Sequence, residues 1–340
     1  MIRPLLKLFA ALTLFASTAT LPAQDWAKAT LEKSPRHREY VALKHGDRTV
    51  QAFVVYPEVS NKAPVVILIH EIFGLSDWAK EMADELAAQG FIVIAPDLVS
   101  GFGPGGGGID SFASQDTVTK AVSMLDPAVV TADLDAAADY GKKIPSANGK
   151  LFVVGFCWGG GKSFDFATRR HDLSAAFVFY GTPPPDVTAI NAPVYGFYAG
   201  NDARITATVP TTVAAMKVAG KKYDPVTYDG AGHGFMRAGE APDANPANKA
   251  AREQGFQRLV DLIGKTNAGT AMIHVTPADA RKAAIVGFAV KRPTAVPSAL
   301  ICHDPAPTAV ATKSTRQSAA KSADASAATP ADTMDMASMM

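Results

Sequence analysis

Short apolar runs alternate with longer amphipathic segments through the middle of the chain, from about residue 39 to residue 265. The apolar runs have the composition of buried strands, and the longer segments repeat their apolar residues at helical spacing. Strands are expected at 64–69, 91–95, 151–155, 175–180 and 194–199, and helices at 77–88, 129–143 and 244–264. This alternation predicts a mostly parallel central sheet with helices on both faces.

Two strand-like segments, 40–44 and 49–56, precede this alternation on either side of the turn His45-Gly46-Asp47. Two such segments joined by a short turn that contains Gly are expected to pair antiparallel. An antiparallel pair followed by parallel strand–helix units is the plan of the α/β-hydrolase fold. We therefore expect one α/β-hydrolase domain at 39–265, with an N-terminal lead-in at 25–38.

The first 24 residues have the pattern of a secretory signal peptide. Arg3 and Lys7 supply positive charge, an apolar run follows at 8–15, and small residues come after it. The apolar run is shorter than the roughly 20 residues that a membrane-spanning helix needs. We expect cleavage after Ala19 or Ala23 and an exported mature protein, periplasmic or secreted, that does not associate with the membrane.

Beyond residue 265 the composition shifts to Thr, Ala, Pro, Ser and Lys, and from residue 305 large apolar side chains are almost absent. Such a segment cannot bury enough surface to offset its ordering entropy, so 266–340 is expected to be a largely disordered tail. The apolar piece 283–290 could dock on the domain as a strand or a helix. The terminal methionines could bind copper(I), but no His or Cys stands beside them, so a flexible tail is favoured.

The charge balance and the cysteine count restrict the partners and the chemistry. The 340 residues carry a formal net charge of +1, which gives no electrostatic basis for binding nucleic acid or an anionic membrane. Two cysteines, Cys157 and Cys302, are too few for a disulfide scaffold or a Cys-rich metal site. We expect a monomer without a metal or cofactor that acts on a small molecule.

The segment Gly155-Phe156-Cys157-Trp158-Gly159-Gly160 follows a predicted buried strand and precedes a predicted helix at 159–169. It fits the nucleophile elbow, Gly-x-nucleophile-x-Gly, with cysteine as the nucleophile. Small residues are needed because the backbone at such a turn is strained and crowded. The positive end of the following helix favours the reactive thiolate. A buried structural cysteine is the alternative, but it would not need this context.

An acid and a histidine follow the cysteine in the order that this fold uses for its catalytic partners. Asp202 comes just after the strand 194–199, and His233 comes just after the strand-like segment 225–228. His233 is expected to act as general base, with Asp202 holding the correct tautomer of its imidazole.

The loop after the first parallel strand reads Ile69-His70-Glu71-Ile72-Phe73-Gly74. In this fold that loop donates one backbone N–H to the oxyanion hole, and the residue after the nucleophile donates the other. The donors here are expected to be Ile72 and Trp158. Glu71 would disfavour a thiolate beside it unless it moves, or it could be a surface acid. His70 could mimic the His-Gly of ordinary esterases or simply pack under the site.

Together the segments at 71–74, 96–98, 155–160 and 232–235 resemble the dienelactone hydrolase family over about residues 39–265. The resemblance implies a Cys157-Asp202-His233 triad, with Glu71 holding the thiol in its resting state. It also implies that Arg237 binds the substrate carboxylate. The chain departs from the family where a second carboxylate-binding arginine is expected, because Val99-Ser100-Gly101 stands there. A two-arginine clamp is therefore reduced to one.

These features favour an exported hydrolase that cleaves a carboxylic ester or lactone through an acyl-enzyme on Cys157. One alternative is a non-catalytic exported binding protein that has kept the hydrolase fold, although a binder would not need the ordered set of Cys157, Asp202 and His233. Another is a thiol redox protein, but no resolving cysteine lies near Cys157 in the sequence.

Overall fold

A computed structural model describes residues 24–268. Outside the described residues therefore lie all of the expected signal peptide except Gln24 and all of the expected tail beyond residue 268. That part of the tail includes the piece 283–290, Cys302 and the terminal methionines. Export remains an expectation. Among residues 24–268 there is no helix long and apolar enough to cross a membrane.

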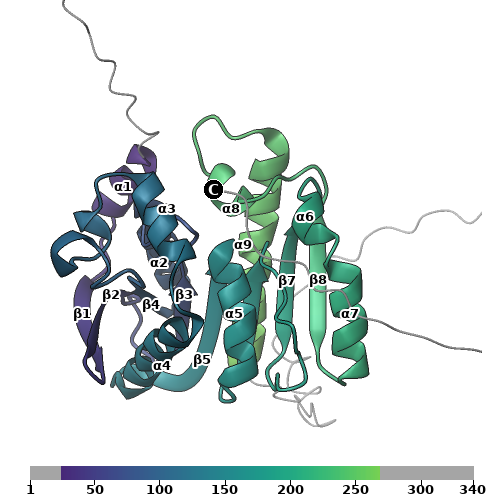
Figure 1. Cartoon of the computed structure of the whole chain (residues 1–340), viewed down its shortest axis with the longest axis horizontal. Helices are drawn as coiled ribbons and strands as arrows, with labels where there is room; N and C mark the ends of the chain where they lie inside the picture. Colours follow the sequence, from purple (N-terminus) through teal and green to yellow (C-terminus); the bar gives the residue numbers. More distant parts are fainter. Residues whose placement is uncertain (1–23, 269–340) are drawn as a thin grey trace, which may run out of the picture. The chain divides into compact units, whose positions relative to one another are not determined.

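The described residues form an eight-stranded sheet in the order β1-β2-β4-β3-β5-β6-β7-β8 (Figure 1). The strands are β1 (Arg38–His45), β2 (Arg48–Val55), β3 (Ala63–Ile69), β4 (Ile92–Pro96), β5 (Ala147–Phe156), β6 (Ala175–Phe179), β7 (Val194–Ala199) and β8 (Tyr223–Tyr228). β1 pairs with β2, and β2 with β4, in antiparallel register, and the remaining neighbours are parallel. The predicted leading pair and parallel sheet are confirmed.

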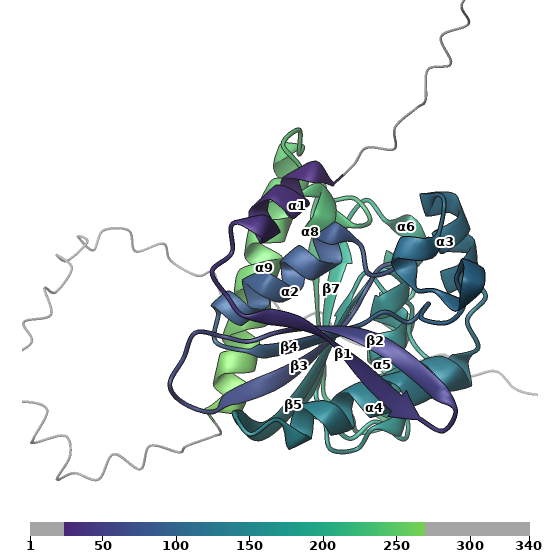
Figure 2. The same cartoon turned by 90° about the vertical axis from the view of Figure 1, so that its left-hand side faces the viewer.

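Helices cover both faces of this sheet, as Figure 2 shows, which confirms the predicted α/β-hydrolase fold. They are α1 (Asp25–Glu32), α2 (Asp77–Ala88), α3 (Gln115–Ser123), α4 (Pro127–Lys143), α5 (Trp158–Arg169), α6 (Ala203–Thr206), α7 (Val209–Val218), α8 (Phe235–Ala238) and α9 (Pro246–Asn267). Side chains of α3, α4, α5 and α7 share one core cluster with one face of the sheet, and those of α1, α2, α8 and α9 share the other.

Successive residues of the central strands point to opposite faces, so each strand contributes to both clusters. In β3, Val65, Ile67 and Ile69 belong to one cluster while Val66 and Leu68 belong to the other. Because both faces are covered, every residue of β3 is buried. This double burial explains why the predicted parallel strands appear in the sequence as continuous apolar runs rather than as alternating patterns.

Part of the lead-in at 25–38 is a helix that the apolar pattern did not predict. α1 has only eight residues, half of them polar, but Ala27 is fully buried and Trp26 and Leu31 pack against the cluster of α2 and α9. Tertiary contacts therefore stabilise a helix too short to be stable by itself. It places Gln24 at the start of α2, where the Gln24 side chain accepts a hydrogen bond from the backbone N–H of Trp78.

Glu81 of α2 is a buried carboxyl beside two other acids. Its side chain lies near Glu85 and Glu240, and these three could together hold a metal ion. Arg252 of α9 already pairs with Glu85 and Glu240, whereas Glu81 Oε2 has no hydrogen-bond partner in residues 24–268. Burial raises the pKa of Glu81 well above its ordinary value, and the charge of Glu240 raises it further.

Glu81→Gln is expected to stabilise the protein at high pH. The folded state keeps a proton on Glu81 that the unfolded chain releases above a pKa of about 4.3, so wild-type stability falls as pH rises toward the folded-state pKa. The variant lacks this loss and should gain about 1–3 kcal/mol in unfolding free energy at pH 8, with little gain at pH 5. Urea unfolding at both pH values measures the difference. Exposed Glu253→Gln on α9 is the control, and an equal gain at both pH values would contradict the assignment.

Candidate active site

Cys157 lies at the sharp turn between β5 and α5, in the geometry of a nucleophile elbow. Its backbone has φ +56° and ψ −116°, which is strained for a residue with a side chain. The neighbouring glycines are required by close backbone approach. A Cβ on Gly155 would lie 1.9 Å from the carbonyl oxygen of Gly159, and one on Gly159 would lie 2.4 Å from those of Ile69 and His70. The crowding therefore packs the start of α5 directly against the end of β3.

The structure brings Cys157, His233 and Asp202 together from three loops at the carboxyl edge of the sheet. His233 Nε2 lies 3.1 Å from Cys157 Sγ, and His233 Nδ1 lies 2.5 Å from Asp202 Oδ2. Asp202 begins α6 just after β7, and His233 follows β8. Because parallel strands end at the same edge, residues far apart in sequence meet there. Through these two hydrogen bonds a proton can pass from the sulfur of Cys157 to the imidazole of His233, while Asp202 holds the ring.

The electrostatics of this group favour a protonated His233. Its hydrogen bond with Cys157 raises the pKa of His233 to about 9; partial burial opposes this rise, and the hydrogen bond with Asp202 adds to it. Asp202 is almost completely buried, so its carboxylate faces the imidazole rather than water. An imidazolium beside sulfur stabilises a thiolate, the form of cysteine that attacks carbonyl carbons.

Glu71 points at Arg237 in this structure. Arg237 Nε donates to Glu71 Oε2 over 2.7 Å, and the Tyr180 hydroxyl donates to Glu71 Oε1 over 3.4 Å. Burial raises the pKa of the Glu71 carboxyl, and the positive charge of Arg237 opposes that rise. Within residues 24–268 no hydrogen bond joins Glu71 to the thiol, which instead faces His233.

Tyr180 belongs to the site, although sequence reasoning gave it no role and placed it at the end of a strand. It is fully buried, with a positive φ of 39°, directly after β6. Its ring meets that of His233 edge to face, with centroids 5.0 Å apart. No local motif marks this tyrosine. The single sequence feature that could have pointed to Tyr180 is its position at the end of the strand that follows the elbow along the chain.

The two predicted oxyanion donors lie on adjacent elements. Ile72 is in the turn after β3, and Trp158 is the first residue of α5. Neither backbone N–H donates a hydrogen bond within residues 24–268. Trp158 lies at a helix N-terminus, where backbone N–H groups lack intrahelical acceptors. Both N–H groups are thus available to a developing negative charge.

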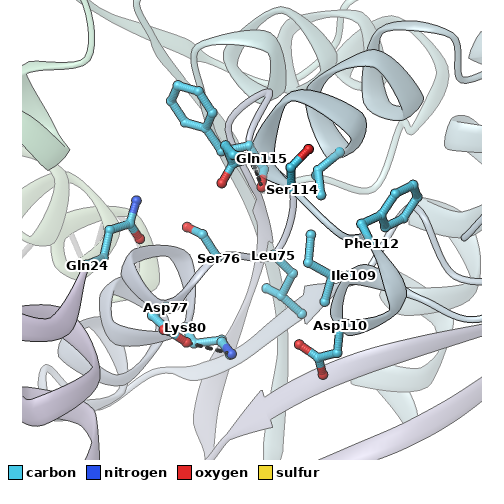
Figure 3. A pocket seen from close by; sticks show the side chains of 12 residues that line it. Gln24, Leu75, Ser76, Asp77, Lys80, Ile109, Asp110, Phe112, Ser114 and Gln115 are labelled. Atoms are coloured by element: carbon cyan, nitrogen blue, oxygen red, sulfur yellow. Dashed lines mark hydrogen bonds and ion pairs between the residues drawn. The ribbon is translucent and has the colours of Figure 1, made fainter. Parts of the chain in front are cut away.

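Phe73, which follows Ile72 in the same turn, lines one cavity and contacts Arg237, a residue that lines another. The guanidinium of Arg237 lies 4.9 Å from the centre of the Phe73 ring, and Arg237 lines a cavity of about 490 Å³ together with Gln24, Asp25 and Trp26 of the N-terminal segment. Phe73 itself lines a second cavity of about 310 Å³ (Figure 3). Figure 3 shows Leu75, Ile109, Phe112, Ser76 and Gln115 around this space, with the Asp77–Lys80 ion pair below them.

Comparisons with known proteins agree with one another. A family model described as "Dienelactone hydrolase family" matches residues 50–267. A Salmonella typhi protein named "Putative carboxymethylenebutenolidase" is 32% identical over 230 residues, 63% of this chain and 82% of that protein. A carboxymethylenebutenolidase of Pseudomonas putida is 26% identical over 233 residues, 67% of this chain and 98% of that protein. A crystal structure titled "Putative Dienelactone Hydrolase" from Klebsiella pneumoniae matches with a TM-score of 0.59 at 26% identity, covering 68% of this chain and 99% of the other.

Proposed function

The chain belongs to the dienelactone hydrolase family of carboxylic-ester hydrolases, and we propose that it cleaves its ester or lactone through a thioester on Cys157. The observation that carries this proposal is the continuous hydrogen-bonded chain from Cys157 Sγ through His233 to Asp202. It supports Cys157 as nucleophile, His233 as general acid and base, and Asp202 as the group that orients the imidazole.

In the first half of the proposed reaction, the Cys157 thiolate forms a C–S bond with the ester carbonyl carbon. The carbonyl electron pair moves onto oxygen, where the N–H groups of Ile72 and Trp158 stabilise it. As the C–O bond to the leaving group breaks, protonated His233 gives its proton to the departing oxygen. The product of this half is an alcohol, or the freed hydroxyl of an opened lactone, and a thioester on Cys157.

In the second half, neutral His233 takes a proton from water, and the resulting hydroxide attacks the thioester carbonyl. The C–S bond breaks, the carboxylic acid leaves, and the proton on His233 again faces the Cys157 thiolate. The raised pKa of His233 suits this role because the imidazolium persists at neutral pH between turnovers.

Arg237 and Glu71 define the charge that the proposed substrate meets. The charge of Arg237 is countered by Glu71, and Val99-Ser100-Gly101 offers no second arginine. The proposed substrates are therefore neutral or singly charged esters and lactones, rather than ones that need two cationic contacts. A substrate carboxylate would compete with Glu71 for Arg237, and the freed Glu71 would then lie in reach of the site. The proposal also includes export, based on the N-terminal pattern alone.

A panel of aryl esters, neutral lactones and acidic lactones, assayed on the mature protein, tests this function. Turnover of neutral esters is expected, with acidic lactones cleaved less well, because the two-arginine clamp is reduced to one. Cys157→Ala provides the blank for every substrate. Absence of turnover across the whole panel, with binding of one compound by calorimetry, would instead favour the non-catalytic binding protein.

A further inference from the structure

His70 lies next to the site, but the proposed mechanism gives it no role. It follows β3 directly, and its side chain is fully buried. Burial lowers the pKa of His70 to about 4, so its ring is neutral at working pH. Its Nδ1 lies 2.7 Å from the backbone carbonyl oxygen of Glu71. Because a carbonyl oxygen can only accept, Nδ1 must carry the proton and donate it.

That hydrogen bond fixes the peptide unit that carries the first oxyanion donor. The carbonyl of Glu71 and the N–H of Ile72 belong to one planar trans peptide, in which the two groups point in opposite directions. When His70 holds the carbonyl on one side, the Ile72 N–H is directed to the other. The same carbonyl also accepts from the backbone N–H of Gly74 over 3.1 Å across the turn. His70 adds a second, shorter bond that resists rotation of this peptide, whose Ile72 N–H has no acceptor in residues 24–268.

His70 also contacts the residue that carries the second donor. Its ring stacks on the indole of Trp158, with centroids 5.7 Å apart and planes 12° from parallel. The backbone below this stack is closely packed, since a Cβ on Gly159 would meet the carbonyl oxygen of His70 at 2.4 Å. One side chain therefore joins the end of β3, the turn of Ile72 and the first turn of α5.

We propose that His70 is a positioning residue of the oxyanion hole, which aims the Ile72 N–H through the Glu71 carbonyl and sets its spacing from Trp158 through the ring stack. This inference rests on the proposed function. The role uses two features of histidine, the Nδ1–H donor and the flat ring. Phenylalanine has the flat ring without the donor, and asparagine has a donor near the position of Nδ1 without the ring. The second ring nitrogen, Nε2, is buried without a partner among the described residues, so a polar contact there does not explain the residue.

Two reactions of Cys157 separate this role from a structural one. Acylation by an aryl ester places negative charge on a carbonyl oxygen, whereas alkylation by iodoacetamide displaces iodide and needs no oxyanion hole. His70→Phe is expected to slow acylation about 10- to 100-fold, less than complete loss of a donor. The fall should lie in kcat with KM little changed, because the lost contact acts in the transition state. The alkylation rate should stay unchanged. His70→Asn should recover much of the acylation rate.

The outcomes are distinct. If His70→Phe slows alkylation as much as acylation, His70 supports the fold or the thiol, and the proposal is wrong. An unchanged acylation rate in His70→Phe would also overturn it. Cys157→Ala is run alongside: if it retains turnover, the proposed function itself fails, whereas loss of turnover there with a normal His70→Phe defeats the positioning role alone. Circular dichroism of each variant reports whether it folds.

Discussion

Cys157→Ala is expected to lower ester hydrolysis by at least about 10⁴-fold, because His233 would then have no nucleophile to activate. The fold should remain, since removal of one sulfur atom at a partly exposed position costs about 1 kcal/mol of stability. The measurement is kcat/KM with an aryl ester, together with thermal unfolding of both proteins.

Iodoacetamide labelling gives the matching chemical test. Cys302→Ala leaves Cys157 as the single thiol, should keep full activity and should lose that activity as label is incorporated. A saturating ester should protect the thiol from label. Turnover that persists in Cys157→Ala, or labelling that substrate does not slow, would remove Cys157 from the reaction.

Asp202→Asn is expected to lower kcat/KM by about 10³-fold or more at neutral pH. In the wild type, Asp202 accepts from His233 Nδ1–H, which leaves Nε2 facing the thiol. An asparagine can donate to Nδ1 instead, which places the proton on Nε2 and prevents it from accepting one from sulfur. Asp202 also raises the pKa of His233, so the imidazolium of the variant should be lost at lower pH.

The pH dependence of kcat/KM and of Cys157 alkylation measures both effects. Asp229→Asn is the matched control, because this exposed acid lies in the same loop as His233 and is not part of the hydrogen-bonded chain. Its activity and pH profile should equal those of the wild type. An Asp202→Asn variant with only a few-fold loss would show that His233 keeps its tautomer without the carboxylate.

The sequence alone determined the fold and the order of its parts. Strands buried on both faces must be continuously apolar, and the helices between them must carry an apolar stripe, so β7 and α2 were predicted at their observed bounds. The glycines around Cys157 predicted the elbow because no larger residue fits there. Asp202 and His233 could be chosen because each follows a predicted strand. α1 was missed because its eight residues make only about two turns, too few for a helical pattern to be recognised in the sequence.

Only the tertiary structure decided how neighbouring groups share charge and hydrogen bonds at the site. Glu71 and Arg237 are 166 positions apart, and nothing local predicts that they pair or that Tyr180 joins them. The burial of Glu81 beside Glu240 and the contact of His70 with the Glu71 carbonyl are likewise products of packing. The physical reason is range: hydrophobic periodicity and turn sterics act between residues close along the chain, whereas pKa shifts, ion pairs and peptide orientation depend on atoms that only folding brings within a few ångströms.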